Sequence, residues 1–243
     1  MKTLIWAHRG SSTYAPENTL EAFDLAAKQG ADGIELDVHL TADRKIVVAH
    51  DDRVERVSNG TVLISQSTLE VLKKLDFSKT HPEYSPVRIP TLREVYDLIK
   101  PTGMTVNVEI KSNWIPYEGL EKLLIELENE MGMTGRIWYS SFNHFSLKEI
   151  KEIAPNSKTG ILYSTALVDP FVYAKYIKAD AIHAYFPTLM GPGVISGCKE
   201  NGIRIHPWTV DDIETMKKLI SVGVDAIITN KPDVLAGILK AGV

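Results

Sequence analysis

The sequence alternates between short apolar runs and longer stretches in which apolar residues recur with a helical period. The short runs predict buried strands, and the helical period predicts amphipathic helices. Strands are predicted at residues 3–7, 33–40, 105–110, 136–140, 158–161, 181–184, 202–205 and 225–228. Helices are predicted at residues 20–29, 92–99, 117–130, 145–153, 170–177, 192–199, 211–222 and 232–239. About eight strand-then-helix units result, which is the number in a closed parallel (β/α)₈ barrel, the TIM-barrel fold of the α/β class.

Residues at the helix ends agree with this pattern. Thr19 precedes the first predicted helix, where its hydroxyl can accept a hydrogen bond from a free backbone N–H. Gly30 follows the same helix, at a position that favours a residue able to adopt positive φ. Thr91 and Glu94 have the spacing of a capping box at the start of the next helix.

The alternation is interrupted between residues 51 and 88, which contain an Asn-Gly turn and a loop with several prolines. The apolar run at 46–50 is interpreted as a continuation of the second strand or as a short partner of it. We therefore predict one barrel domain over residues 1–243, with a small insertion at about 51–88 after the second strand. A doubly wound open sheet is disfavoured, because no glycine-rich turn follows the first strand.

Composition narrows the class of protein. With 44% hydrophobic and 24% charged residues, the 243-residue chain has the composition of a soluble globular protein. A net charge of −4 gives no reason to expect nucleic acid or an anionic membrane as a partner. The apolar run at residues 4–7 is too short for a secretory signal, and no stretch approaches the ~18 apolar residues of a membrane span. The only cysteine, Cys198, excludes an intrachain disulfide and is expected to pack in a helix, so we expect a cytoplasmic protein.

The second strand carries two carboxylates on one face. Its apolar residues alternate with Glu35, Asp37 and His39, and at about 3.3 Å rise per residue the two carboxylates lie roughly 6.6 Å apart along the strand. This face meets water if the strand lies in a half-exposed antiparallel sheet. If both faces are buried, the two carboxylates need a cation to compensate them.

Other polar residues gather at the predicted carboxyl ends of the strands, where the active sites of barrel enzymes lie. Taken singly, each has a structural explanation: a strand-end histidine is more often structural than catalytic, and a tryptophan more often packs than binds. Together, three carboxylates, two histidines, an arginine and a lysine at one mouth are not how a barrel interior is normally filled. The residues at these ends include His8, Arg9, His50, Asn107, Glu109, Lys111, Asn143, His183, His206, Trp208 and Asn230.

Strand parity strengthens this interpretation. Helices on the outside bury the apolar faces of the second and third strands, so Glu35, Asp37 and Glu109 must point into the barrel. Three inward carboxylates repel one another unless a divalent cation lies between them, and oxygen ligands suit Mg²⁺ or Ca²⁺ better than Zn²⁺. Arg9 and Lys111 add donors that suit a phosphate. Metal, phosphate and histidines free for proton transfer indicate phosphoester hydrolysis.

Several stretches in this order resemble the glycerophosphodiester phosphodiesterases of the short bacterial type. They span the chain from the first strand to the last, so their combination is specific although each piece alone is weak. The matching stretches are residues 8–10, 15–19, 35–38, 40–41, 49–52, 89–92, 107–111, 140–142 and 207–210.

The resemblance implies a (β/α)₈ barrel that hydrolyses glycerophosphodiesters to sn-glycerol 3-phosphate and an alcohol. It implies one divalent metal ion, Ca²⁺ or Mg²⁺, held by Glu35, Asp37 and Glu109. Its catalytic histidines correspond to His8 and His50, which act as general acid and base. Residues expected to bind substrate are Arg9 and Lys111, which contact the phosphate, and Trp208, which offers an apolar wall; Glu17 is expected near the metal.

Two positions depart from the common pattern of the family. Asp211 stands where the family often has Asn, and Asn230 stands where it often has Asp. Neither is expected to touch the predicted catalytic residues, so both are expected to affect substrate preference or local structure. His39 points inward by parity, but its position varies in the family and it is assigned no role.

Several alternatives stay open at this point. The chain could be a related barrel phosphodiesterase that acts on intact phospholipids, although no basic or aromatic membrane-binding stretch is evident. It could instead be a glycerophosphate-binding protein that is not an enzyme. The sequence does not choose between Mg²⁺ and Ca²⁺, between His8 and His50 as the acid, or between a cyclic phosphate intermediate and direct attack by water. The preferred alcohol and the oligomeric state are not readable either.

Overall fold

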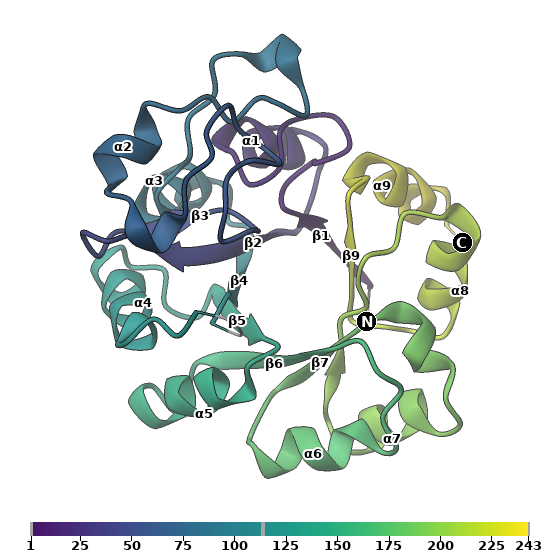
Figure 1. Cartoon of the computed structure of the whole chain (residues 1–243). Coiled ribbons are helices and arrows are strands. Elements are labelled where there is room, and N and C mark those ends of the chain that lie inside the picture. The colour runs from purple at the N-terminus through teal and green to yellow at the C-terminus, as the bar shows by residue number, and fades with distance from the viewer. Residues whose placement is uncertain (1, 113–114, 243) are drawn as a thin grey trace.

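Within residues 2–112 and 115–242, which the computed structural model describes, eight parallel strands form the wall of a barrel (Figure 1). Each predicted strand is present, although the seventh is shorter than expected. The strands are β1 (Leu4–His8), β2 (Gly33–Leu40), β4 (Thr105–Ile110), β5 (Ile137–Ser141), β6 (Lys158–Tyr163), β7 (Ala181–Ala184), β8 (Arg204–Ile205) and β9 (Ala226–Thr229).

The barrel closes between its last two strands. The ladder runs in the order β8-β7-β6-β5-β4-β2-β1-β9, so β1 lies between β2 and the last strand of the chain. Backbone hydrogen bonds between these two strands and the residues next to them complete the ring: Asp225 N donates to Ile205 O (3.0 Å), and Ile228 N donates to Pro207 O (2.9 Å). The predicted (β/α)₈ barrel is therefore confirmed, and the open doubly wound sheet is ruled out.

Helices surround the barrel on the outside (Figure 1). Thr19 caps the first of them by accepting a hydrogen bond from Ala22 N, and Thr91 and Glu94 form the expected capping box. Cys198 is buried within helix α7 (Val194–Glu200), as predicted. No helix in the described part of the chain is both long and apolar enough to cross a membrane. The helices that follow the barrel strands are α1 (Leu20–Lys28), α3 (Leu92–Ile99), α4 (Leu120–Glu130), α5 (His144–Ile153), α6 (Pro170–Tyr176), α7 (Val194–Glu200), α8 (Ile213–Ser221) and α9 (Pro232–Ala241).

The main hydrophobic core lies between the barrel wall and the helices. Every residue of β2 is buried, and Ile34, Leu36 and Val38 pack in this core on the outer face of the strand. Because side chains alternate along a strand, Glu35 and Asp37 point to the inside of the barrel. The same alternation in β4 turns its polar residues inward.

Aromatic rings and two histidines fill the floor of the barrel. Trp6 and Trp138 are buried there, with ring centroids 5.8 Å apart. His206 Nδ1 lies 2.9 Å from His183 Nε2, and both histidines contact the two tryptophans. Burial lowers the pKa of His183 to about 3, so the pair of imidazoles is uncharged and contributes to packing. The two histidines are thus wrongly placed at the mouth by the sequence pattern, because β7 and β8 are short and their polar side chains lie below the rim.

The insertion has a small core of its own. It begins after β3 (Ile46–Val48), which pairs antiparallel with β2 and is therefore the short partner strand, one of the two readings of this run. Its elements lie beside β2 and α3 in Figure 1. The remaining short elements are η1 (Ile64–Gln66), α2 (Leu69–Lys73), η2 (Pro82–Tyr84), η3 (Lys100–Thr102) after α3, and η4 (Phe186–Met190) after β7. The core of the insertion includes Val47, Ala49, Val54, Ile64, Leu72, Phe77 and Ile89.

The packing of the barrel floor is tested by adding one methyl group. A Cβ at Gly160 would overlap His183 Nε2, and the ring has no room to move because both tryptophans contact it. Gly160→Ala is therefore expected to lower the free energy of unfolding by about 1–3 kcal/mol. The measurement is urea denaturation followed by circular dichroism.

Gly237→Ala is the matched control for this substitution. A Cβ at Gly237, in α9, meets no atom within 4 Å, and the change is expected to add about 0.5–1 kcal/mol by its helix propensity. Equal unfolding midpoints for Gly160→Ala and the unmodified protein would contradict the packing described for the floor.

Candidate active site

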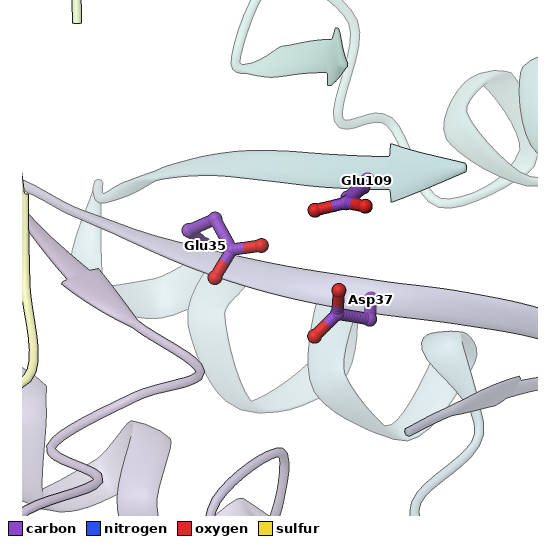
Figure 2. Close-up of side chains that lie close together, drawn as sticks. All are labelled: Glu35, Asp37 and Glu109. Carbon is purple, nitrogen blue, oxygen red and sulfur yellow. The ribbon is translucent and has the colours of Figure 1, made fainter. Parts of the chain in front are cut away.

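Three carboxylates from two neighbouring strands form a cluster (Figure 2). Glu35 and Asp37 extend from β2, and Glu109 extends from β4, where it lies opposite Asp37 in the strand register. One oxygen from each of the three lies within 4.8 Å of the others. Their exposed fractions are 4%, 1% and 8%, so little water reaches them. The structure thus brings together the three residues that the sequence predicts as metal ligands.

The charges of this cluster are only partly balanced by the protein. Burial raises the pKa of Glu35, and the nearby charges of Asp37 and Glu109 raise it further. Burial also raises the pKa of Glu109, against the opposing effect of Lys111. Burial alone would raise the pKa of Asp37, but Lys111 and Arg9 bring it well below its usual range. Two carboxyls that resist ionisation beside one that is ionised favour a cation between them.

The donor set fits a hard divalent cation. All three side chains offer oxygen, which Mg²⁺ and Ca²⁺ prefer. Asp37 Oδ1 is buried and accepts no hydrogen bond from the residues that the structure describes, and the same is true of Asn107 Oδ1 on the neighbouring strand. Asp37 is held from its other oxygen by Asn18, whose Nδ2 donates to Oδ2 over 2.8 Å. Asn18 and Asn107 therefore belong to the surroundings of the cluster, although the sequence pattern alone assigns them no role.

Two basic side chains, Lys111 and Arg9, flank the carboxylates. Lys111 Nζ donates to Glu109 Oε1 over 2.8 Å and lies 3.5 Å from Asp37 Oδ1. The Arg9 backbone N–H donates to Glu35 Oε2 over 3.0 Å, and its guanidinium donates to Glu17 Oε1 over 2.9 Å. Glu17 is thus placed near the cluster through Arg9. This arrangement leaves positive charge beside the cavity, where it can meet an anion.

His8 stands at the end of β1 with both ring nitrogens in defined surroundings. Nδ1 lies 2.7 Å from Asn230 Oδ1, and Nε2 lies 3.9 Å from Glu35 Oε2. Burial lowers the pKa of His8 to about 4, and the positive charge of Arg9 contributes to this. The expectation that Asn230 does not touch the predicted catalytic residues is therefore wrong. The reason is barrel closure, because β9 pairs with β1 and brings residue 230 beside residue 8.

His50 follows β3 and is held by a different kind of partner. Its Nδ1 lies 2.7 Å from Asp51 Oδ1, and Asp51 Oδ2 accepts a hydrogen bond from Arg56 Nε over 2.6 Å. Burial would raise the pKa of Asp51, but the hydrogen bonds from His50 and Arg56 lower it below its usual value. Arg56 also donates to Glu17, so the insertion is tied to both histidine loops. The sequence carries no signal for Arg56, because its place depends on how the insertion folds.

His39 lies behind His50. It is buried, with Nδ1 2.8 Å from Tyr117 Oη and Nε2 3.1 Å from the carbonyl oxygen of His50. Burial lowers the pKa of His39 to about 4. His39 therefore points inward, as its parity predicts, but supports the backbone of His50 and does not line the cavity.

The cavity beside the cluster has one polar and one apolar wall. Trp208 and Phe142 form the apolar wall, with ring centroids 5.6 Å apart in an edge-to-face contact. Trp208 Nε1 donates to His183 O over 2.8 Å, which fixes the ring and leaves only its apolar surface for a ligand. The residues that line the cavity are His8, Arg9, Glu35, His50, Asn107, Glu109, Lys111, Ser140, Phe142, Leu162, Trp208 and Ile228. All the site residues predicted from the sequence lie around this cavity except Asp37, which belongs to the acidic cluster beneath it.

Comparisons with known proteins show which family the chain resembles in sequence and in fold. The sequence model of the glycerophosphoryl diester phosphodiesterase family matches residues 8–234. The chain is 45% identical to a glycerophosphodiester phosphodiesterase of Caldanaerobacter subterraneus subsp. tengcongensis, over the full length of both proteins. It is 35% identical to one from Bacillus altitudinis, covering 95% of this chain and 96% of that protein. A solved Oleispira antarctica phosphodiesterase in complex with the product sn-glycerol-3-phosphate is 31% identical, with a TM-score of 0.88 and coverage of 98% of this chain and 97% of that one.

Binding of a divalent cation to the acidic cluster should stabilise the fold. A ligand at about a hundred times its Kd adds about 2.7 kcal/mol, which for a chain of this size raises Tm by about 5–10 °C. We expect Mg²⁺ or Ca²⁺ to give such a rise over the protein in EDTA, measured by scanning calorimetry. Glu35→Gln should abolish the rise, and in EDTA it should raise Tm because it removes one repelling carboxylate.

Glu214→Gln serves as the control for this experiment, because Glu214 is an exposed residue of α8 far from the cluster in the fold. It should respond to the cation like the unmodified protein. A Tm that is the same in EDTA, Mg²⁺ and Ca²⁺ would rule out cation binding at the cluster.

Proposed function

The chain belongs to the glycerophosphoryl diester phosphodiesterase family and is an enzyme of that family, and we propose that it hydrolyses glycerophosphodiesters to sn-glycerol 3-phosphate and an alcohol with the help of a divalent cation and two histidines. The observation that carries the proposal is that four kinds of group surround a single cavity. These are the acidic cluster, the guanidinium of Arg9, the ammonium of Lys111, and the imidazoles of His8 and His50. The solved relative that binds sn-glycerol-3-phosphate supports this choice of product.

The phosphate of the substrate would bind between the side chains of Arg9 and Lys111. Arg9 offers a planar guanidinium and Lys111 a point charge, and both suit the oxygens of a phosphodiester. Glu35, Asp37 and Glu109 would hold Mg²⁺ or Ca²⁺, which when bound neutralises charge on the phosphate and on the carboxylates. Trp208 would pack against the non-polar part of the substrate.

The two histidines would transfer the protons of the reaction. Both have Nδ1 engaged by a side-chain oxygen, so each would present Nε2 to the substrate. One histidine removes a proton from the attacking oxygen, and the other donates a proton to the leaving alcohol. The attacking oxygen is either the 2-hydroxyl of the substrate's own glycerol, which gives a cyclic phosphate that water opens, or water itself.

We also propose a cytoplasmic location, because a chain with Cys198 as its only cysteine forms no intrachain disulfide.

The role of the histidines is tested by single substitutions. His8→Ala and His50→Ala should each lower kcat on glycerophosphocholine by about 10²–10⁴-fold at saturating cation, because each removes one proton-transfer group. His81→Ala is the control, because this histidine belongs to the insertion and does not line the cavity. Near-normal turnover by both active-site variants would refute the two-histidine scheme.

A second substrate class is kept because of one observation. Phe145, Val168 and Tyr176 are 83%, 93% and 82% exposed, on or beside α5 and α6, and apolar surface of this kind can contact lipid. A phosphodiesterase acting on intact phospholipid would use it.

The two substrate classes are separated by comparing glycerophosphocholine with vesicles of phosphatidylcholine. Most of the residues that line the cavity are polar, and we expect kcat/KM on glycerophosphocholine to be at least about a hundredfold higher, about 2.7 kcal/mol of discrimination. Glycerol 3-phosphate is measured with each cation and with EDTA. Faster hydrolysis of the vesicles would overturn the assignment. If no glycerophosphodiester releases glycerol 3-phosphate in a cation-dependent way, the result favours a binding protein.

A further inference from the structure

A chain of hydrogen bonds leads from His8 away from the cavity. Asn230 Oδ1 lies 2.7 Å from His8 Nδ1, and Asn230 Nδ2 donates to Asp211 Oδ2 over 2.6 Å. Asp211 Oδ1 accepts two further hydrogen bonds, from the backbone N–H of Asn230 (2.8 Å) and from Thr229 Oγ1 (3.0 Å). Both oxygens of Asp211 are therefore engaged as acceptors, and both meet donors from the end of β9.

Asp211 decides which way round the amide of Asn230 lies. A carboxylate can only accept, so it must face the NH₂ group of the amide. The amide oxygen is then left facing His8 Nδ1, and since that oxygen cannot donate, the proton of the hydrogen bond belongs to the ring nitrogen. His8 Nε2 consequently carries the lone pair, and it is the nitrogen on the side of Glu35.

Ser12, the other neighbour of the amide, does not make this choice. Its hydroxyl lies 2.7 Å from Asn230 Oδ1 and 2.8 Å from the carbonyl oxygen of His8. A hydroxyl both donates and accepts, so it could pair with either end of the amide. The direction of the whole chain therefore comes from Asp211.

We propose that Asp211 is a positioning residue, which through the amide of Asn230 holds His8 in the tautomer with its proton on Nδ1 and its lone pair on Nε2. In this state an imidazole facing the cavity is ready to accept a proton. The catalytic consequence rests on the proposed function, whereas the tautomer itself does not. The two positions at which the chain departs from the family pattern thus lie against each other and act together.

Asp211→Asn tests the direction of the chain. An amide at position 211 keeps the acceptor for the Asn230 backbone N–H but places NH₂ where Oδ2 was. The Asn230 amide must then turn round and present its NH₂ to His8, which forces the ring proton to Nε2. We expect the protonated and unprotonated ring nitrogens of His8 to exchange their ¹⁵N resonances. The measurement is ¹⁵N NMR of histidine-labelled protein at neutral pH. The resonances of His8 are identified from their loss in His8→Gln.

The double substitution Asp211→Asn with Asn230→Asp is the rescue. A carboxylate at position 230 accepts from His8 Nδ1 on one side and from the amide at 211 on the other, so the original tautomer should return. With glycerophosphocholine, we expect Asp211→Asn to lower kcat about tenfold to a hundredfold with little change in KM, below the full 10²–10⁴-fold of a proton-transfer group. The double variant should recover kcat to within about threefold of the unmodified protein.

Asp212→Asn is the matched control, because Asp212 is the neighbouring exposed residue that caps α8. Asparagine is equally good at such a cap, so tautomer and kcat should not change. The proposal is overturned if Asp211→Asn leaves the proton on Nδ1, or if the double variant keeps the tautomer of the single one.

Two further arms keep the outcome clear. If Asp211→Asn does not fold, Asn230→Leu removes the acceptor of His8 while leaving Asp211 in place, and the preference for the Nδ1 proton should be lost; its persistence would overturn the proposal. The NMR measurement needs no substrate. If the protein does not hydrolyse glycerophosphodiesters, the proposed function fails while the tautomer result still decides the role of Asp211.

Discussion

The structure depends on the burial of three carboxylates within 4.8 Å of one another inside a closed barrel. Little water reaches them there, and the protein alone balances their charge incompletely, as the raised pKa values of Glu35 and Glu109 indicate. Lys111 and Arg9 each lie beside two of the carboxylates, and Asn18 donates a hydrogen bond to one of them. These contacts reduce the cost of burying the charges without removing it. A cluster of this kind destabilises the fold unless a cation balances its charge, which is why we interpret it as a cation-binding site.

The two histidines beside the cluster are supported from opposite sides of the fold. His8 depends on barrel closure, since its partner Asn230 follows the last strand. His50 depends on the insertion, since Asp51 is held by Arg56. An amide supports one ring and a carboxylate supports the other, so the two imidazoles differ in the partner that fixes them. The insertion is thus part of the proposed active site and not only a covering segment.

Predictions from the sequence succeeded where a strict local period applied. The alternation in β2 and β4 put Glu35, Asp37 and Glu109 on the inner face, and the structure has them there. The placement of His183 and His206 at the mouth, which rested on their position at predicted strand ends, was wrong, because a residue's height in the barrel depends on strand length and stagger. The histidine pair fills the floor, where only packing against Trp6 and Trp138 explains it.

By itself, the sequence determined the class of fold, the face of each strand and the chemical character of the mouth, because these follow from periods of two and 3.6 residues. Only the tertiary structure decided which polar groups touch. The contact between His8 and Asn230 joins residues 222 positions apart, and that between Arg56 and Glu17 joins a folded insertion to a loop after β1. Such contacts depend on ring closure and on loop conformation, and a local pattern contains no information about either.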